Sequence, residues 1–168
     1  GLTGSLMNII GNQQVGSLAG RADSNTIINQ TFSTGMVSGD SNVGGLVGTF
    51  IGLLSQSFTT GNISGNESVG GLAGYFNGTL SESFTTGNMS ATQIVGGLIG
   101  TASHSQLTHS YTTSSIIGLS NNVGFITGNS INTEIISTHW ATDKAVNILD
   151  PEINVNEGYF GDLFAQLR

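Results

Sequence analysis

The sequence predicts an all-β protein, in which a parallel β-solenoid (β-helix) of about five coils is followed by a short non-repeat cap. One phrase returns along the chain, as VGGLVG at 43–48, VGGLAG at 69–74 and VGGLIG at 95–100. Its valines recur every 26 to 28 residues, at Val15, Val43, Val69, Val95 and Val123. Glycine breaks the chain into short segments rich in Val, Thr, Ser and Phe, which favours strands over helices. A unit of this length at a fixed period is typical of stacked coils.

Two further columns of side chains share this frame. One is aromatic and consists of Phe32, Phe58, Phe84, Tyr111 and Trp140. The other lies four residues earlier and is aliphatic: Ile28, Leu54, Leu80, Leu107 and Ile136. Each strand is expected to pair in parallel with the same strand of the next coil, about 4.8 Å away, so that equivalent side chains stack. We expect both columns to fill the interior.

A polar column lies between them, at Gln30, Gln56, Glu82, His109 and Thr138. Simple strand alternation from Leu54 to Phe58 would point Gln56 inward. A buried Glu82 would be costly without a partner, so we expect a corner exposed to water; a buried polar ladder is the alternative.

The glycines of the phrase form two columns. One contains Gly16, Gly44, Gly70, Gly96 and Gly124, and the other Gly20, Gly48, Gly74, Gly100 and Gly128. Such positions are expected where φ is positive or where backbone passes close to backbone. A phosphate-binding loop is the competing interpretation, but no copy carries an accompanying lysine or a following helix.

The domain organisation follows from where the repeat stops. Residues 1–143 carry the repeats, and residues 144–168 have lost them. Tyr159, Phe160, Leu163 and Phe164 could fold over the last coil and cover its open edge. The alternative is that 144–168 begins a following region or a linker.

Composition excludes several partners. Only 8% of the residues are charged, the formal net charge is -7, and Lys plus Arg number three. These residues supply no basic patch for a nucleic-acid backbone or an anionic membrane. No apolar run approaches the length of a membrane span, so membrane insertion is not expected. Cysteine is absent, which excludes a disulfide framework.

The repeated unit consists of VGGLVG, an aliphatic residue and SFTTGNISG, after which the next unit begins with VGGLAG. It resembles the GLUG repeat of bacterial surface and secreted proteins. That repeat occurs in filamentous-haemagglutinin-like adhesins and in non-catalytic regions of some immunoglobulin A proteases. The resemblance covers roughly residues 3–143, and HWATD at 139–143 is similar to a motif that closes such runs. Ser17 and Phe125 depart from it, because each replaces the second glycine of the phrase. The resemblance implies a solenoid segment of a large exported protein and brings no catalytic residues.

Catalysis, metals and cofactors are not expected. His104, His109, His139 and Asp143 could be imagined in a hydrolase or metal site, but they lie in different coils without a nucleophile elbow or metal-ligand spacing. Calcium-binding solenoids repeat Asp at fixed positions, whereas the acids here occupy unrelated positions in the frame. We therefore expect a non-enzymatic protein without cofactor.

The expected function is that of a structural and adhesive module, located outside the cell or on a bacterial cell surface. If the aromatic residues point inward, their neighbours point outward and form a flat rank of hydroxyls: Ser57, Thr59, Ser83, Thr85, Ser110 and Thr112. This rank would contact a host-cell or surface receptor, and a glycan is one candidate. Ice binding by the same rank, a passive spacer between neighbouring domains and a repeat region of a secreted protease stay open as alternatives.

Overall fold

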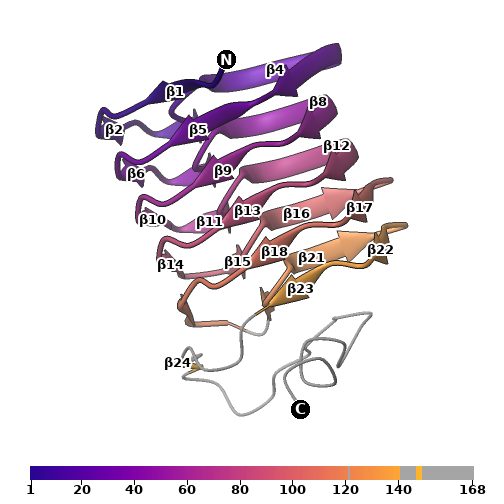
Figure 1. Ribbon diagram of the computed structural model, residues 1–168. Coiled ribbons are helices and arrows are strands. Elements are labelled where there is room, and N and C mark those ends of the chain that lie inside the picture. The colour runs from indigo at the N-terminus through magenta and orange to yellow at the C-terminus, as the bar shows by residue number, and fades with distance from the viewer. Residues whose placement is uncertain (121, 141–146, 149–168) are drawn as a thin grey trace.

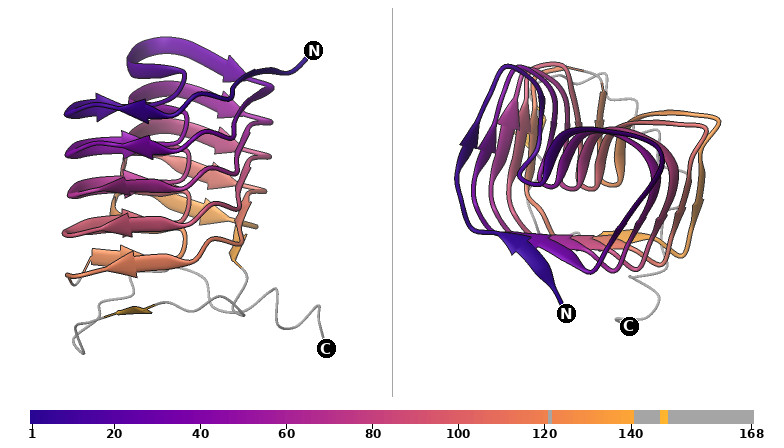
Figure 2. Two further views of the ribbon diagram at one scale, coloured as in Figure 1. Left: turned by 90° about the vertical axis from the view of Figure 1, so that its left-hand side faces the viewer. Right: turned by 90° about the horizontal axis from the view of Figure 1, so that it is seen from above.

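The computed structural model describes residues 1–120, 122–140 and 147–148. All regular elements among these residues are strands, no helix occurs among them, and the strands pair in parallel. The chain winds through about five coils that stack along one axis, and the coils superpose when seen along that axis (Figures 1 and 2). The predicted β-solenoid is confirmed. The expected cap at 144–168 lies outside the described residues, apart from the strand at Asn147–Ile148.

Each coil passes through four sheets in turn, which we call sheets A, B, C and D. Sheet A contains β1 (Thr3–Ser5), β5 (Thr31–Ser33), β9 (Phe58–Thr59), β13 (Phe84–Thr85), β18 (Tyr111–Thr112) and β23 (His139–Trp140). Sheet B contains β2 (Ile9–Ile10), β6 (Val37–Ser38), β10 (Ile63–Gly65), β14 (Met89–Ala91), β19 (Ile116–Gly118) and β24 (Asn147–Ile148).

Sheet C contains β3 (Gln13–Val15), β7 (Ser41–Gly44), β11 (Glu67–Gly70), β15 (Ile94–Gly96) and β20 (Asn122–Gly124). Sheet D contains β4 (Ala19–Asn29), β8 (Val47–Ser55), β12 (Ala73–Ser81), β16 (Ile99–Ser103), β17 (Gln106–Thr108), β21 (Thr127–Ile131) and β22 (Glu134–Ile136). In the fourth and fifth coils sheet D is split between two strands. Its long strands close one side of the stack (Figure 1).

The register places equivalent residues of the phrase side by side. Val69 pairs with Val43 on one side and with Val95 on the other, and Gly70 pairs with Gly44 and Gly96. Extra residues fall outside these columns. One insertion shifts the register of β4 against β8 between Ala22 and Thr26. The predicted period is therefore confirmed, and its length variation falls in a bulge of β4 and in connections between strands.

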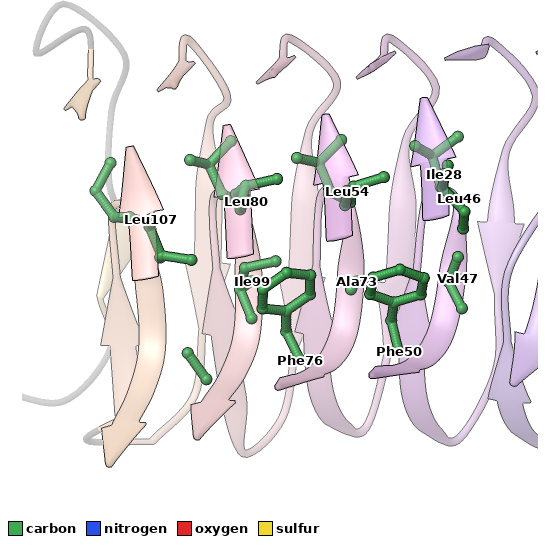
Figure 3. Close-up of a cluster of buried hydrophobic side chains, with 14 of the residues drawn as sticks. Ile28, Leu46, Val47, Phe50, Leu54, Ala73, Phe76, Leu80, Ile99 and Leu107 are labelled. Atoms are coloured by element: carbon green, nitrogen blue, oxygen red, sulfur yellow. The ribbon is translucent and has the colours of Figure 1, made fainter. Parts of the chain in front are cut away.

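The interior holds two apolar clusters. The larger lies between sheet D and the phrase, with Leu54, Leu80 and Leu107 stacked in one column and Phe50 over Phe76 beside them (Figure 3). The smaller lies between sheets B and C and includes Val43, Ile63 and Val69. Burial of aliphatic side chains in such columns is the main favourable contribution to folding.

The glycines of the phrase allow sheets C and D to approach closely. A Cβ on Gly44 would collide with Val47 O and with the backbone of the next coil, and a Cβ on Gly74 with the backbone at Asn42 and Val43. Of the described glycines, only Gly52 and Gly78 have positive φ. The predicted glycine columns thus serve backbone approach, the second of the two reasons expected.

The corner in front of sheet A is also confirmed. Gln30, Gln56, Glu82 and His109 are exposed, and their φ angles lie between 47° and 54°. The fifth member is Ser137 with φ 46°, rather than Thr138 as the sequence suggested. A left-handed residue turns the chain, so the alternation of side chains does not continue across it.

The orientation predicted for sheet A is wrong for this reason. Phe32, Phe58 and Phe84 are partly exposed, and Tyr111 is 44% exposed. The residues expected outside are buried: Ser57, Thr59, Ser83, Thr85, Ser110 and Thr112. The alternation predicted from Leu54 through Gln56 to Phe58 is interrupted by the left-handed corner at Gln56, so the buried and exposed faces of sheet A are exchanged relative to the prediction.

The prediction that Trp140 continues the aromatic column is wrong. His139 pairs with Tyr111, and Trp140 pairs with Thr112, so Trp140 points inward and is buried. Single extra residues precede Gln106 and Asn122, relative to Thr79 and Ile94 of the coil before. With these insertions, the residue that pairs with Tyr111 is His139. A prediction that matches one aromatic residue with the next would instead choose Trp140, one residue later.

Candidate functional site

The outer surface of sheet A carries three parallel columns of side chains. The corner column contributes Gln30, Gln56, Glu82 and His109; the ring column Phe32, Phe58, Phe84 and Tyr111; and the threonine column Thr34, Thr60 and Thr86. We call this surface the aromatic face. It is the side of the stack formed by β5, β9, β13 and β18 in Figure 1. An ordered row of partly exposed rings on a regular sheet marks it as the candidate contact surface.

The rings stack on one another along the solenoid axis. Phe58 and Phe84 lie 4.9 Å apart between centroids with an interplanar angle of 3°, and Phe84 and Tyr111 lie 4.9 Å apart at 4°. Phe32 and Phe58 lie 5.4 Å apart at 12°. Each inner ring is therefore covered on both faces by its neighbours. The surface presents ring edges to a partner, so a sugar cannot stack on the face of Phe58 or Phe84.

Polar groups line the row of rings on one side. Gln30 Nε2 donates to Gln56 Oε1 at 3.4 Å, and Gln56 Nε2 donates to Glu82 Oε2 at 2.9 Å. This ladder fixes the direction of the side-chain amides along the axis. On the other side Thr60 and Thr86 are exposed. Hydrogen-bonding groups thus flank an apolar strip, an arrangement suited to an extended, regular ligand surface.

The six hydroxyls predicted as the binding rank have backbone partners inside the solenoid. Ser57 Oγ donates to Ser55 O at 2.7 Å and accepts from Thr31 N at 3.1 Å. Ser83 and Ser110 repeat this arrangement in the next coils. The corner prevents some backbone N–H and C=O groups from forming hydrogen bonds between strands, and the hydroxyls provide partners for these groups. In these positions they present no surface to a ligand.

The threonines of the rank brace sheet A against the glycine phrase. Thr59 Oγ1 donates to Gly71 O at 2.8 Å, and Thr85 Oγ1 donates to Gly97 O at 2.7 Å. Their methyl groups occupy the space that a side chain on Gly45 or Gly71 would need. The second glycine of the phrase and the buried threonine are therefore a complementary pair.

Both members of this pair change together in the last coil. Phe125 stands at the glycine position and Trp140 at the threonine position, and their rings stack at 5.4 Å with an angle of 9°. In the first coil Ser17 replaces the glycine, and its Oγ donates to Gly45 O at 2.5 Å. The two departures from the repeat are thus adaptations of the end coils.

The three histidines occupy separate positions. His109 belongs to the corner column, and His139 continues the ring column next to Tyr111. His104 lies at another corner, with Nε2 3.2 Å from Asn132 Nδ2. Within the described residues no group of three or more His, Asp or Glu side chains could hold a metal ion. Asp143 lies outside those residues.

No family model, curated protein or solved structure matches this chain. In the part of the chain that the structure describes, no helix has the length and apolar character that a bilayer span requires.

Proposed function

We propose that this chain is a non-catalytic structural and adhesive module of a bacterial surface or secreted protein, with the aromatic face as its contact surface. The row of partly exposed rings carries the proposal, because a chain that needed only to fold would gain more free energy by burying them. Four rings in register with two polar columns make a regular strip along the axis. The repeated phrase, which resembles that of exported repeat proteins, supports the location.

The partner that best fits this strip has a flat, regular surface. Ring edges and side-chain amides repeat at the coil spacing, about 4.8 Å. Few charges flank the rings, so attraction would depend on apolar contact and on hydrogen bonds to hydroxyl or amide groups. An array of glycans on a cell surface offers both. The ligand would lie across several coils, because the inner ring faces are covered.

The contact surface is tested by charge and bulk placed beside the rings. The variant Thr60→Lys with Thr86→Lys projects two long side chains over the aromatic face, where the native residues are exposed. Its matched control is Ser64→Lys with Ser90→Lys, in the outward column of the neighbouring sheet B. Binding of each protein to a glycan array and a panel of host cells is measured, with thermal melts as the folding control.

The proposal predicts specific binding by the native chain, a loss of at least about ten-fold in the Thr60 and Thr86 variant, and no change in the Ser64 and Ser90 control. Binding that survives the first variant would exclude the aromatic face. No binding by any of the three proteins would leave a passive spacer as the better account.

A further inference from the structure

Asn77 is the only asparagine of the chain that a glycine follows directly. The backbone nitrogen of a following residue can attack the side-chain carbonyl carbon of asparagine, and glycine hinders this attack least because it has no Cβ. Asn77 lies in the middle of β12 and is partly exposed, so water reaches it. By this chemistry, the pair Asn77 and Gly78 is where the chain loses a side-chain amide most readily.

The fold requires the glycine of this pair. Gly78 has a φ of 144°, a conformation that favours glycine, and it pairs with Gly52, whose φ is 150°. A Cβ on Gly78 would collide with the carbonyl oxygen of Gly52. A larger residue, which would slow the attack on Asn77, is therefore excluded from this position.

The coil that follows contains one extra residue at this point of sheet D. The register sets two residues of β12 against three of the next coil, because Phe76 pairs with Ala102 and Thr79 pairs with Gln106. The extra residue interrupts the sheet between β16 and β17, and Ser105 lies in this interruption.

The hydroxyl of Ser105 holds the nitrogen that would attack. Gly78 N donates to Ser105 Oγ at 3.3 Å, and Ser105 is 6% exposed. The same Oγ lies 3.0 Å from Ser103 O and 3.1 Å from Phe76 O, to which it donates. The attack needs a free nitrogen that has lost its proton, and a hydrogen-bonded strand must open locally to release one. Ser105 therefore restrains the reactive nitrogen.

We propose that Asn77 is a site of spontaneous deamidation and that the hydroxyl of Ser105 controls its rate. The nitrogen of Gly78 bonds to Cγ of Asn77, the Cγ–Nδ2 bond breaks, and Nδ2 takes up the proton and leaves as ammonia. Water then opens the succinimide at one of its two carbonyl groups, which yields aspartate or isoaspartate. Isoaspartate adds a carbon to the main chain of β12, which pairs with strands on both sides. The reaction thus marks chains that have opened in sheet D, away from the aromatic face.

The test compares deamidation at position 77 in the native chain and in three variants. Ser105→Ala removes the hydroxyl, whereas Ser105→Thr keeps it and introduces the residue of the next coil, Thr133, whose Oγ1 also donates to the carbonyl two residues earlier. Ser83→Ala is the control for lost stability, because Ser83 Oγ likewise accepts a backbone N–H and donates to a backbone carbonyl, but in sheet A.

Each protein is incubated in mildly alkaline buffer, and aspartate and isoaspartate at position 77 are quantified by peptide mass spectrometry. Thermal melts check that each variant is folded. The native chain unfolded in urea gives the unrestrained rate, and this comparison needs no substitution.

The folded native chain should deamidate at least about ten-fold more slowly than the unfolded chain, and Ser105→Ala at least about five-fold faster than the folded native chain. Ser105→Thr and Ser83→Ala should stay within about two-fold of the native rate. Equal rates in the folded and unfolded native chain would overturn the restraint by the fold. Equal rates in Ser105→Ala and Ser83→Ala would overturn the role of the Ser105 hydroxyl, and an unfolded chain without product at position 77 would overturn the site itself.

Discussion

At the scale of single residues, hydrogen bonds to the backbone explain why sheet A buries polar side chains. The serine or threonine that follows each corner residue is an example. Ser83 is 1% exposed, its Oγ donates to Ser81 O at 2.8 Å, and the N–H of Ser57 donates to it at 3.1 Å. A buried hydroxyl with both bonds made is tolerated, whereas its removal leaves a buried N–H without an acceptor. Serine is therefore required by the backbone of the neighbouring coil.

The expected cost of Ser83→Ala is about 1–3 kcal/mol in the free energy of unfolding, because Ser57 N–H and Ser81 O both lose their partner. Thr86→Ala is the matched control, since Thr86 is exposed one residue beyond the strand, and it should change stability by less than about 0.5 kcal/mol. Denaturant unfolding of both variants measures the difference. Equal stabilities would show that the hydroxyl column carries no such role.

At the scale of the element, sheet A is built from strands of two or three residues, and a left-handed residue precedes each of them from β5 to β23. The sequence predicted the coils, the exposed corner and the glycine columns, because each depends on a pattern that recurs along the chain. It did not predict which face of sheet A is buried. Strand alternation does not continue through the left-handed residue Gln56, so a pattern of alternating residues that runs through this corner predicts the opposite face of sheet A.

Trp140 shows the second limit of a sequence pattern. Aromatic character suggested that it continues the column of Tyr111, but two single-residue insertions place His139 there. A periodic sequence pattern can identify a column of equivalent residues. After an insertion it cannot determine which of two adjacent residues belongs to that column. The stack of Trp140 on Phe125 is a tertiary contact between sheet A and the phrase, and no local signal encodes it.

Two phenylalanines of neighbouring sheets test the assignment of the faces energetically. Phe76 is fully buried in the larger cluster, so Phe76→Ala should cost about 3–5 kcal/mol. Phe84 keeps one edge in water and is held mainly by its two ring neighbours, so Phe84→Ala should cost about 1–2 kcal/mol. Chemical denaturation gives both values, and a larger loss for Phe84 than for Phe76 would contradict the outward position of the ring column.

At the scale of the whole molecule, the solenoid separates its surfaces. The aromatic face runs along one side of the stack (Figure 1), whereas the two apolar clusters fill its interior. Because the side chains of the aromatic face point away from the two apolar clusters, substitutions of its exposed residues, such as Thr60→Lys, leave those clusters intact.

Everything proposed for the contact surface depends on which side chains of sheet A face water, and thiol accessibility measures that directly. The chain contains no cysteine, so Ser83→Cys, Phe84→Cys and Thr85→Cys each introduce one reporter at consecutive positions. In the folded protein the thiol at position 84 should react rapidly with a water-soluble disulfide reagent, and those at 83 and 85 should react only after denaturation, since Ser83 and Thr85 are 1% and 0% exposed. Rapid reaction at 83 and 85 with protection at 84 would contradict the account.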